Sequence, residues 1–432
     1  MILNYIWVGF FLVGFVVAFV QWLFMGNTEV FSQVVQSTFK MAELGVMGIA
    51  LPLAGVMTLW LGFMNIGEKA GAVRFMGKIV GGFFSKLFPE IPKNHPAHGQ
   101  LLMNFSANML GLDNAATPMG LKAMQSLQEL NPKKDTASNA QIMFLAINTS
   151  GLTIIPVSIL ALRAAAGAAN PTDVFIPLLI ATAVSTMVAI LYVGLRQRLN
   201  LWNKTVMGFF AAVIGLIALL VLGNKLNLHA LYTDLPPFFQ PVLGFLNWGQ
   251  AEWQNFATVV SNLMLLLIIV GFMAGALYKK INVYEAFIDG AKDGFSTTLK
   301  IIPFMVGMLV AIGVFRASGA MDLLMDGFRW FFGLFGSDVR FVDALPTALM
   351  KPLSGSGAKA MMVESMNTFG ADSFAGRLSC LFQGAADTTF YIIALYFGLV
   401  GIKKTRYAVS AGLIADFAGV LAAIGAAYLF FG

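Results

Sequence analysis

The residues of this sequence best suited to chemistry lie in two polar stretches within apolar surroundings. They read NMLGLDNAATPMG (108–120) and MKPLSGSGAKAMM (350–362), and each mixes hydroxyl, amide and charged side chains with turn-forming residues. Further along each half, a second polar motif lies in an apolar run, NTSGLT at 148–153 and GAADTT at 384–389. Such side chains can hydrogen-bond a small polar solute and balance its charge. The four motifs therefore predict a solute-binding site.

We expect the solute to contact the polar residues of these motifs. The substrate-binding candidates are Asn108, Asn114, Thr117, Asn148, Thr149, Ser150 and Thr153 in the first half, and Lys351, Ser354, Ser356, Lys359, Gln383, Thr388 and Thr389 in the second. Lys351 or Lys359 would offset a carboxylate or phosphate on the solute. Asp113 and Asp387 are candidates for binding a coupling cation or proton. A carboxylate inside a membrane costs roughly 2.5–3.5 kcal/mol, so its default role is functional.

A structural role is the alternative for each of these residues. Ser and Thr side chains in membrane helices often bond only their own backbone or a neighbouring helix, and Asp387 would then pair with one of the two lysines. Asp416 lies within the apolar string ADFAGVLAAIG and must face protein, which favours a role in helix packing. Glu43 and Glu364 are expected at the membrane interface.

The composition requires that helices crossing a membrane position these motifs. Of the 432 residues, 58% are hydrophobic and only 11% are charged, whereas soluble domains carry about 25% charged residues. The net charge of +6 does not indicate nucleic-acid binding, because Lys and Arg lie in short loops between apolar runs. The single cysteine, Cys380, excludes an intrachain disulfide and is expected to have a packing role.

Nine apolar runs have roughly the 20 residues needed to cross the hydrocarbon core of a bilayer. They are 3–24, 42–64, 140–165, 173–195, 205–223, 257–278, 299–316, 374–398 and 407–431. The first run lacks a basic n-region and a cleavage site, so we expect a retained spanning helix. Regions 99–130 and 341–370 are interrupted by the polar stretches and predict half-helices around a kink. The amphipathic stretches that precede them, 67–88 and 319–335, are expected to lie in the interface plane.

The order of these features is the same in both halves of the chain, which indicates an internal repeat. The matched strings are WLGFMNIGEKAG (60–71) with AIGVFRASGAMD (311–322), GLDNAATP (111–118) with PLSGSGAK (352–359), and NTSGLT with GAADTT. The predicted parts are a first repeat over 1–196, a connecting helix and loop over 197–256, and a second repeat over 257–432.

Loop charges predict that the two repeats are inverted. The loops rich in Lys and Arg belong in the cytoplasm, and they are 65–98, 196–204, 279–292 and 403–406. Loops 163–173 and 224–256 carry one basic residue each and are expected outside. These sides agree only if each interrupted region enters and leaves on the same side, as a re-entrant hairpin. The sequence thus predicts an all-α polytopic membrane protein of two inverted-topology repeats, although Arg316, Arg329 and Arg340 fall on the outer side.

The same motifs carry a resemblance to known families. WLGFMNIGEKAG, GLDNAATPMGLKAM and NTSGLTIIP resemble spore maturation protein A, and PFMVGMLVAIGVFRASGAMD, KPLSGSGAKAMM and FQGAADTTFYIIALYFG resemble spore maturation protein B. The chain looks like the fusion of the two found in bacteria that do not sporulate, and the likeness covers nearly all of it except 197–256. The resemblance implies a nucleoside-recognition or gate domain in each half and a place in the bacterial cytoplasmic membrane. It also suggests a homo-oligomer.

The function we expect from these features is transport or export of a small charged or zwitterionic solute. Backbone that is not helical persists in a membrane only where protein or a water-filled cavity satisfies it, and paired breaks in inverted repeats mark transporter sites. Alternating access between the repeats would be coupled to Na⁺ or H⁺. No P-loop is present, because SGSGAK (354–359) lacks the spacing.

Other functions are expected less. A Ser nucleophile needs a base, but the only histidines, His95, His98 and His229, lie in predicted loops, so we expect no enzyme. HPAH (95–98) offers two imidazoles without Cys, so no metal centre and no cofactor are expected, while a Na⁺ site of carbonyl, Asp and Ser or Thr oxygens stays open. Nucleoside transport by analogy and a non-transporting assembly partner docking through loop 224–256 remain alternatives. The expected partners are a solute and the lipid bilayer.

Overall fold

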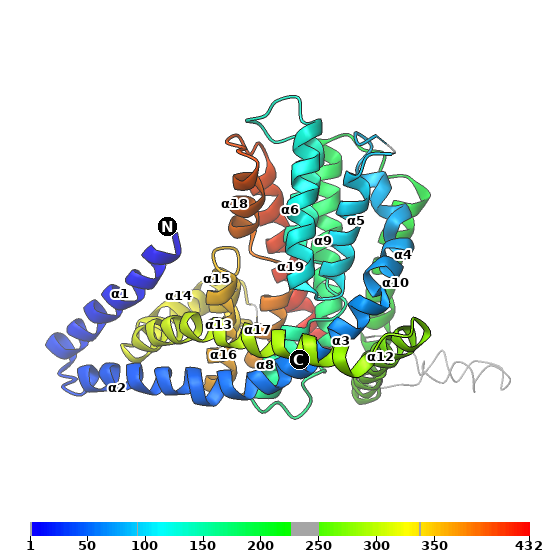
Figure 1. Ribbon diagram of the computed structural model, residues 1–432. Coiled ribbons are helices and arrows are strands. Elements are labelled where there is room, and N and C mark those ends of the chain that lie inside the picture. Colours follow the sequence, from blue (N-terminus) through cyan, green and yellow to red (C-terminus); the bar gives the residue numbers. More distant parts are fainter. Residues whose placement is uncertain (1, 93, 226–249, 337) are drawn as a thin grey trace, which may run out of the picture. The chain divides into compact units, whose positions relative to one another are not determined.

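The computed structural model describes residues 2–92, 94–225, 250–336 and 338–432 (Figure 1). These residues form helices and connecting loops without a β-strand among them, so the all-α prediction is confirmed. One isolated parallel bridge pairs Thr136 with Lys404. Most of the connecting loop 224–256, with His229, lies outside the described residues. The chain forms two compact units, and each unit combines segments from both halves of the sequence.

Unit 1 comprises Met1–Gly71, Pro156–Pro171 and Phe272–Leu395. Its elements are α1 (Ile2–Met25), α2 (Val30–Glu43), the π-helical η1 (Leu44–Ala50), α3 (Leu51–Ala70), α8 (Val157–Ala165), α13 (Val283–Ala317), α14 (Ala320–Gly333), the 3₁₀ turn η3 (Arg340–Ala344), α15 (Leu345–Met350), α16 (Gly355–Phe369), α17 (Phe374–Gly384) and most of α18 (Thr389–Leu399). Helix α13 packs along α1, α2 and α3 and also contacts α16.

The contact between α13 and α3 depends on glycine. A Cβ at Gly290 would lie 2.2 Å from the carbonyl oxygen of Leu61, and one at Gly294 would lie 2.5 Å from that of Met57. The two backbones therefore touch directly, as small residues permit in membrane helices. A larger residue at either position would force the helices apart.

Unit 2 comprises Ala72–Ile155, Thr172–Gly271 and Tyr396–Gly432. Its helices are α4 (Ala72–Leu87), α5 (Ala97–Met109), α6 (Asp113–Leu130), α7 (Asn139–Ser150), α9 (Phe175–Arg196), α10 (Lys204–Lys225), most of α12 (Gln250–Tyr278) and α19 (Ala408–Phe431). Helices α7, α9 and α19 pack on one another, and α5 packs on α4 and α6. Helix α7 is buried on all sides from Ala140 to Ser150, which explains its central apolar run 142–147.

Six described helical stretches, two of which join successive elements, are long and apolar enough to cross a membrane, which makes the chain a multi-pass membrane protein. They are Asn4–Met25, Val30–Ala70, Phe175–Arg196, Val283–Ala317, Phe374–Leu399 and Ala408–Phe431. Two of the other expected spans, 205–223 and 257–278, contain the shorter described apolar helices Lys204–Gly215 and Asn262–Tyr278. The expected number of nine spans is not confirmed.

The predicted single span 140–165 is wrong. Helix α7 ends at Ser150 and α8 begins at Val157, so residues 151–156 separate them. Gly151 leaves α7 with a left-handed φ of 56°, and Pro156 has no N–H with which to continue a helix. An apolar run of spanning length therefore conceals a break.

The two amphipathic stretches are helices, as expected. Helix α4 follows Gly71, and α14 follows Gly319, and both glycines have positive φ. A left-handed residue ends one helix and lets the next leave in a new direction. Their place in the membrane interface stays a prediction.

The three arginines on the expected outer side all pair with carboxylates in unit 1. Arg316 pairs with Glu364, Arg329 with Asp326 and Asp343, and Arg340 with Asp338. A hydrogen bond to Asp343 raises the pKa of the Arg329 guanidinium above its ordinary value. Glu364 is only 5% exposed, and its carboxylate also accepts from Thr368 Oγ1. Its expected position at the membrane interface stays a prediction.

The basic loops of unit 2 meet at one end, which we call the basic end (88–97, 131–138, 197–203 and 400–407). Asn139 Nδ2 donates to Glu90 Oε1 (2.7 Å), and Gln197 Nε2 donates to the Asn139 carbonyl (2.8 Å). Lys404 pairs with Asp135 at 3.2 Å. Hydrogen bonds from Thr136 and then Lys404 hold the pKa of the Asp135 carboxyl below its usual range. The loop before α5 and the loop after α6 therefore lie at the same end of unit 2. A hairpin of these two helices that enters and leaves the membrane on one side requires both loops at that end.

Candidate functional site

All four polar motifs lie where a helix is broken. The breaks are residues 110–112 between α5 and α6, 151–156 between α7 and α8, 351–354 between α15 and α16, and 385–388 between α17 and α18 (Figure 1). The first and third are the predicted interruptions of regions 99–130 and 341–370. The second and fourth occur inside runs that were expected to be continuous helices. Each half of the sequence thus has two broken elements rather than one.

Within each unit, the two breaks are joined by a backbone hydrogen bond. In unit 2, the Ile154 N–H donates to the Met109 carbonyl (2.7 Å), and in unit 1 the Phe390 N–H donates to the Pro352 carbonyl (3.2 Å). Ile154 and Phe390 are equivalent, since each directly follows its matched motif, NTSGLT or GAADTT. Non-helical backbone in a membrane must find partners inside the protein, and the repeats meet this need in the same way.

The unit 2 breaks bring two predicted residues together. Asn108 Nδ2 donates to Asn148 Oδ1 (2.8 Å), and Asn148 Nδ2 donates to the Phe144 carbonyl (2.9 Å). Asn108 lines a pocket of about 190 Å³ together with Gly151 of the second break and Thr186 of α9. Apolar and aromatic side chains form the rest of its wall. The pocket therefore presents a few polar groups on an apolar lining, which is the usual composition of a small-molecule site.

Other predicted residues of this unit serve the local backbone. The hydroxyls of Thr149, Ser150 and Thr153 donate to the carbonyls of Ala146, Ile147 and Gly151, at 3.1, 3.0 and 2.8 Å. These bonds are the ones expected from the structural alternative. Thr117 is half-buried on α6. The side chains of Asp113 and Asn114 lie outside the described part of the chain, so their proposed roles stay predictions.

Three buried polar residues of unit 2 were not among the candidates. Asn104 donates from Nδ2 to the Ala116 carbonyl (2.8 Å) across the α5–α6 break. Its Oδ1, Ser106 Oγ and Thr186 Oγ1 have no hydrogen-bond partner among the described residues, and all three side chains are at most 1% exposed. Asn104 and Ser106 precede the first polar stretch, and Thr186 lies beside Ser185 within the apolar run of α9. A polar residue in the middle of a spanning run was the signal available for Thr186.

In unit 1, Ser354 and Asp387 occupy helix starts. Ser354 Oγ accepts from the Gly357 N–H (3.0 Å) at the beginning of α16 and lies 3.3 Å from Ser356 Oγ. Asp387 is exposed, and its Oδ1 accepts from the Thr388 N–H (2.7 Å) before α18. This local bond competes with a helical one and gives a physical reason for the fourth break. Lys351 is buried at 7% exposure, whereas Lys359 is half-buried.

The unit 1 breaks also bury polar atoms that lack partners. Thr388 Oγ1, Gln383 Oε1 and Thr347 Oγ1 have none among the residues described, and these side chains are at most 4% exposed. A Cβ on Gly355 would lie 2.8 Å from Thr388 Oγ1, so the hydroxyl reaches the start of α16. A buried polar group without a partner costs about 1–3 kcal/mol. Thr347 was not a candidate, and Thr389, which was, is fully buried.

The remaining titratable and sulfur groups have structural surroundings. His98 Nε2 lies 3.2 Å from the Ile91 carbonyl, and His95 Nδ1 accepts from the Ala97 N–H (3.3 Å). Cys380 is buried, with Sγ 3.6 Å from Met366 Sδ, and Asp416 is 5% exposed and faces protein as expected. In the described ranges, no three His, Cys, Asp or Glu residues gather as a metal site.

Comparison with known proteins finds a family whose model matches the segments that contain these breaks. The model of the family described as "Gate: Nucleoside recognition" matches residues 50–166 and 298–403, which together make just over half of the chain and include all four breaks. The chain belongs to the Gate family. No solved structure is significantly similar to it.

Two proteins from Bacillus subtilis (strain 168) are each similar to part of this Gate-family chain. It is 44% identical to spore maturation protein B over 169 residues, which are 39% of this chain and 93% of the relative. It is 40% identical to spore maturation protein A over 188 residues, which are 44% of this chain and 92% of the relative. The predicted resemblance to a fused A and B chain is confirmed.

Proposed function

We propose that this Gate-family protein transports or exports a small charged or zwitterionic solute across the bacterial cytoplasmic membrane, coupled to Na⁺ or H⁺. The observation that carries the proposal is the pair of joined helix breaks in each unit, with buried polar side chains that lack partners in the described structure. A protein that tolerates this cost in a membrane gains most when a ligand supplies the missing partners. Broken helices that bind solute are a recurring device of secondary transporters.

Alternating access between inverted repeats is part of the proposal. The loop charges predict opposite sides of the membrane for the two hairpins, and the gathering of four loops at the basic end of unit 2 is consistent with one cytoplasmic side for that unit's hairpin. Asp387, which is exposed and directly precedes the buried Thr388, is our candidate for the residue that binds the coupling ion.

A nucleoside is the second candidate solute, and the unit 2 pocket favours it. Its wall contains the rings of Phe83, Phe84, Phe105 and Phe209 beside the amide of Asn108. Aromatic faces stack on a flat base, and an amide reads its edge. The family description points to the same class.

Substitution of the unpartnered threonines tests the proposal. In Thr388→Val and Thr186→Val, a hydroxyl without a described partner becomes a methyl group of similar size. We expect solute affinity or uptake in proteoliposomes to fall about tenfold, while the unfolding temperature stays the same or rises, because removing an unsatisfied hydroxyl relieves its desolvation cost.

Matched controls exist in both units. Thr298→Val and Thr182→Val remove buried hydroxyls that already donate to the Gly294 and Leu179 carbonyls, at 3.1 and 3.0 Å, and transport should persist. The solute panel is screened first by thermal stabilisation, expected to reach about 2.7 kcal/mol at a hundredfold excess over Kd. Full transport by both test variants would overturn the proposal. Uptake that ignores Na⁺ and pH gradients would remove the coupling claim alone.

A further inference from the structure

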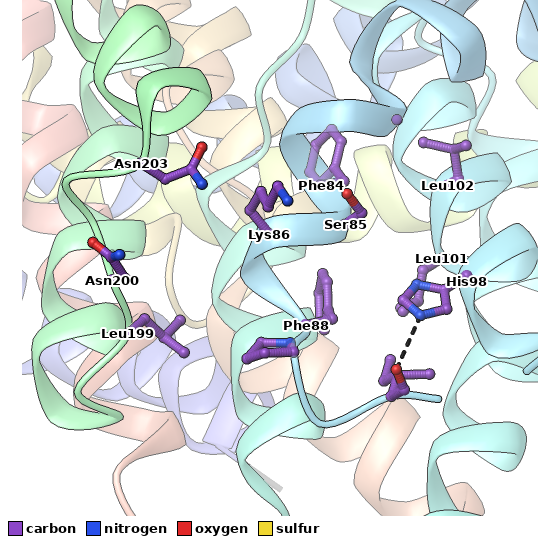
Figure 2. Close-up of a pocket in the computed structure, with 13 residues that line it drawn as sticks. Phe84, Ser85, Lys86, Phe88, His98, Leu101, Leu102, Leu199, Asn200 and Asn203 are labelled. Carbon is purple, nitrogen blue, oxygen red and sulfur yellow. Dashed lines mark hydrogen bonds between the residues drawn. The ribbon is translucent and has the colours of Figure 1, made fainter. Parts of the chain in front are cut away.

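A larger pocket of about 710 Å³ lies in unit 2, away from the helix breaks. Its walls are the end of α4 and the loop after it, the start of α5, and the segment that leads into α10 (Figure 2). The apolar lining includes Phe84, Phe88, Leu101 and Leu102. This volume is in the range of ligand sites.

The polar residues of the lining are distributed over the three walls of the pocket. They are Ser85, Lys86, His98, Asn200 and Asn203. Figure 2 shows Lys86 on α4 and the two asparagines on the segment across the pocket, with the His98 ring held by the Ile91 carbonyl. Lys86 is exposed, so its ammonium is available to an anion.

The pocket opens beside the basic end. Segment 197–203, which supplies its asparagines, is linked through Gln197 to Asn139, and the cations around it include Arg196, Arg198 and Lys204. Loops of this composition belong on the cytoplasmic side, where anionic phospholipids attract them. The charge of the site is therefore complementary to a phosphate.

Helix α4 supplies the surface for an acyl chain. Phe75 and Ile79 are 65% and 61% exposed, and they share one face of α4 with Lys86, at spacings of four and seven residues. An apolar stripe that ends in a lysine matches a lipid tail below a phosphate. A soluble anion would leave this stripe uncovered.

We propose that this pocket binds an anionic phospholipid of the cytoplasmic leaflet, with its phosphate on Lys86, Asn200 and Asn203 and its tail along Phe75 and Ile79. The pocket adjoins the smaller unit 2 pocket, whose wall includes Ile79 and Phe84, but the proposal does not depend on the solute site.

Lipid binding to the full-length, delipidated protein tests this inference. Phosphatidylglycerol, phosphatidylcholine and glycerol 3-phosphate are added separately, and bound ligand is counted by native mass spectrometry. Phosphatidylglycerol should bind tightest, and Lys86→Gln should weaken it about fivefold, the effect of one cation near a lipid surface. Added salt should reduce the difference.

Lys78→Gln is the matched control, because Lys78 is exposed on the same helix and does not line the pocket. Lys86→Arg should retain binding, which separates loss of charge from loss of fold. Equal phosphatidylglycerol binding by the Lys86→Gln and Lys78→Gln variants would overturn the proposal, as would equal binding of phosphatidylcholine. Glycerol 3-phosphate binding as tightly as the lipid would assign the pocket to a soluble phosphate ester instead.

Discussion

At the scale of single residues, buried polar groups divide into two kinds. The hydroxyls of Thr149, Ser150 and Thr153 donate to nearby backbone carbonyls. The hydroxyls of Thr186 and Thr388 have no partner in the described parts of the chain. A buried hydroxyl without a partner costs free energy in an apolar interior, so a ligand that hydrogen-bonds to it there contributes the most binding energy.

Arg163 illustrates a buried charge used for structure. The residue is fully buried in unit 1, where NH1 donates to the Ala371 carbonyl (2.8 Å) and NH2 pairs with Asp372 (3.1 Å). Its other donors reach the carbonyls of Asn170 and Pro171. One guanidinium thereby ties α8 to the loops that follow it and α16.

We predict that Arg163→Ala destabilises the protein by about 3 kcal/mol, because it removes the donor to three carbonyls and the buried cation that pairs with Asp372. Arg340→Ala is the control, since the Arg340–Asp338 pair is about half exposed and should contribute less than ~1 kcal/mol. Denaturant unfolding in detergent measures both. Similar losses for the two variants would contradict a structural role specific to Arg163.

At the scale of elements, helix ends and helix contacts decide the architecture. Each break bonds through its backbone to the other break of its unit, and in unit 1 Ser354 Oγ and Asp387 Oδ1 also accept from backbone N–H groups at the helix starts. Between the breaks, long helices such as α13 can approach α3 closely because glycine lines the contact.

Gly290→Ala tests this close approach. The new methyl group would lie 2.2 Å from the Leu61 carbonyl oxygen, so α3 must move, and we expect a loss of about 1–3 kcal/mol. Gly307→Ala on the same helix meets no atom within 4 Å and should stabilise by up to ~1 kcal/mol through helix propensity. Thermal unfolding of both variants gives the comparison, and an unchanged Gly290→Ala would argue against direct backbone contact.

At the scale of the whole molecule, the compact units do not coincide with the predicted repeats. The chain passes from unit 2 to unit 1 between Ile155 and Pro156, which is within a break, and returns after Pro171. Each unit therefore takes helices from both halves. The repeat boundaries 1–196, 197–256 and 257–432 stay predictions about sequence.

Inversion of the repeats has a direct test. In a Cys380→Ala background, single cysteines replace Lys133, after the first hairpin, and Asn367, at the end of the second, and both positions are exposed. An impermeant thiol reagent applied from outside should label Asn367→Cys but leave Lys133→Cys unmodified until the membrane is opened. Ala169→Cys, in the predicted outer loop, is the control for outside access. Labelling of both hairpin positions from one side would refute inversion.

The sequence by itself determined the class of protein and the location of its polar motifs. The composition predicted a helical membrane protein. The Gly, Pro and Ser residues within 108–120 and 350–362 predicted two helix breaks, because these residue types act locally on the backbone. The repeated order of motifs and the family resemblance could also be recognised, because both depend on short local stretches of sequence.

Only the tertiary structure decided which polar groups have partners. An apolar run such as 140–165 or 374–398 has the same hydropathy whether or not the helix is broken, so hydropathy alone did not locate the breaks at 151–156 and 385–388, and the structure shows the backbone bonds that join them to the other breaks. Thr149 and Thr186 are both buried threonines in helices, but one hydroxyl donates to a carbonyl of its own helix and the other has no partner among the described residues. Hydrogen bonding and burial depend on neighbours that are distant in the chain, and residue type cannot specify them.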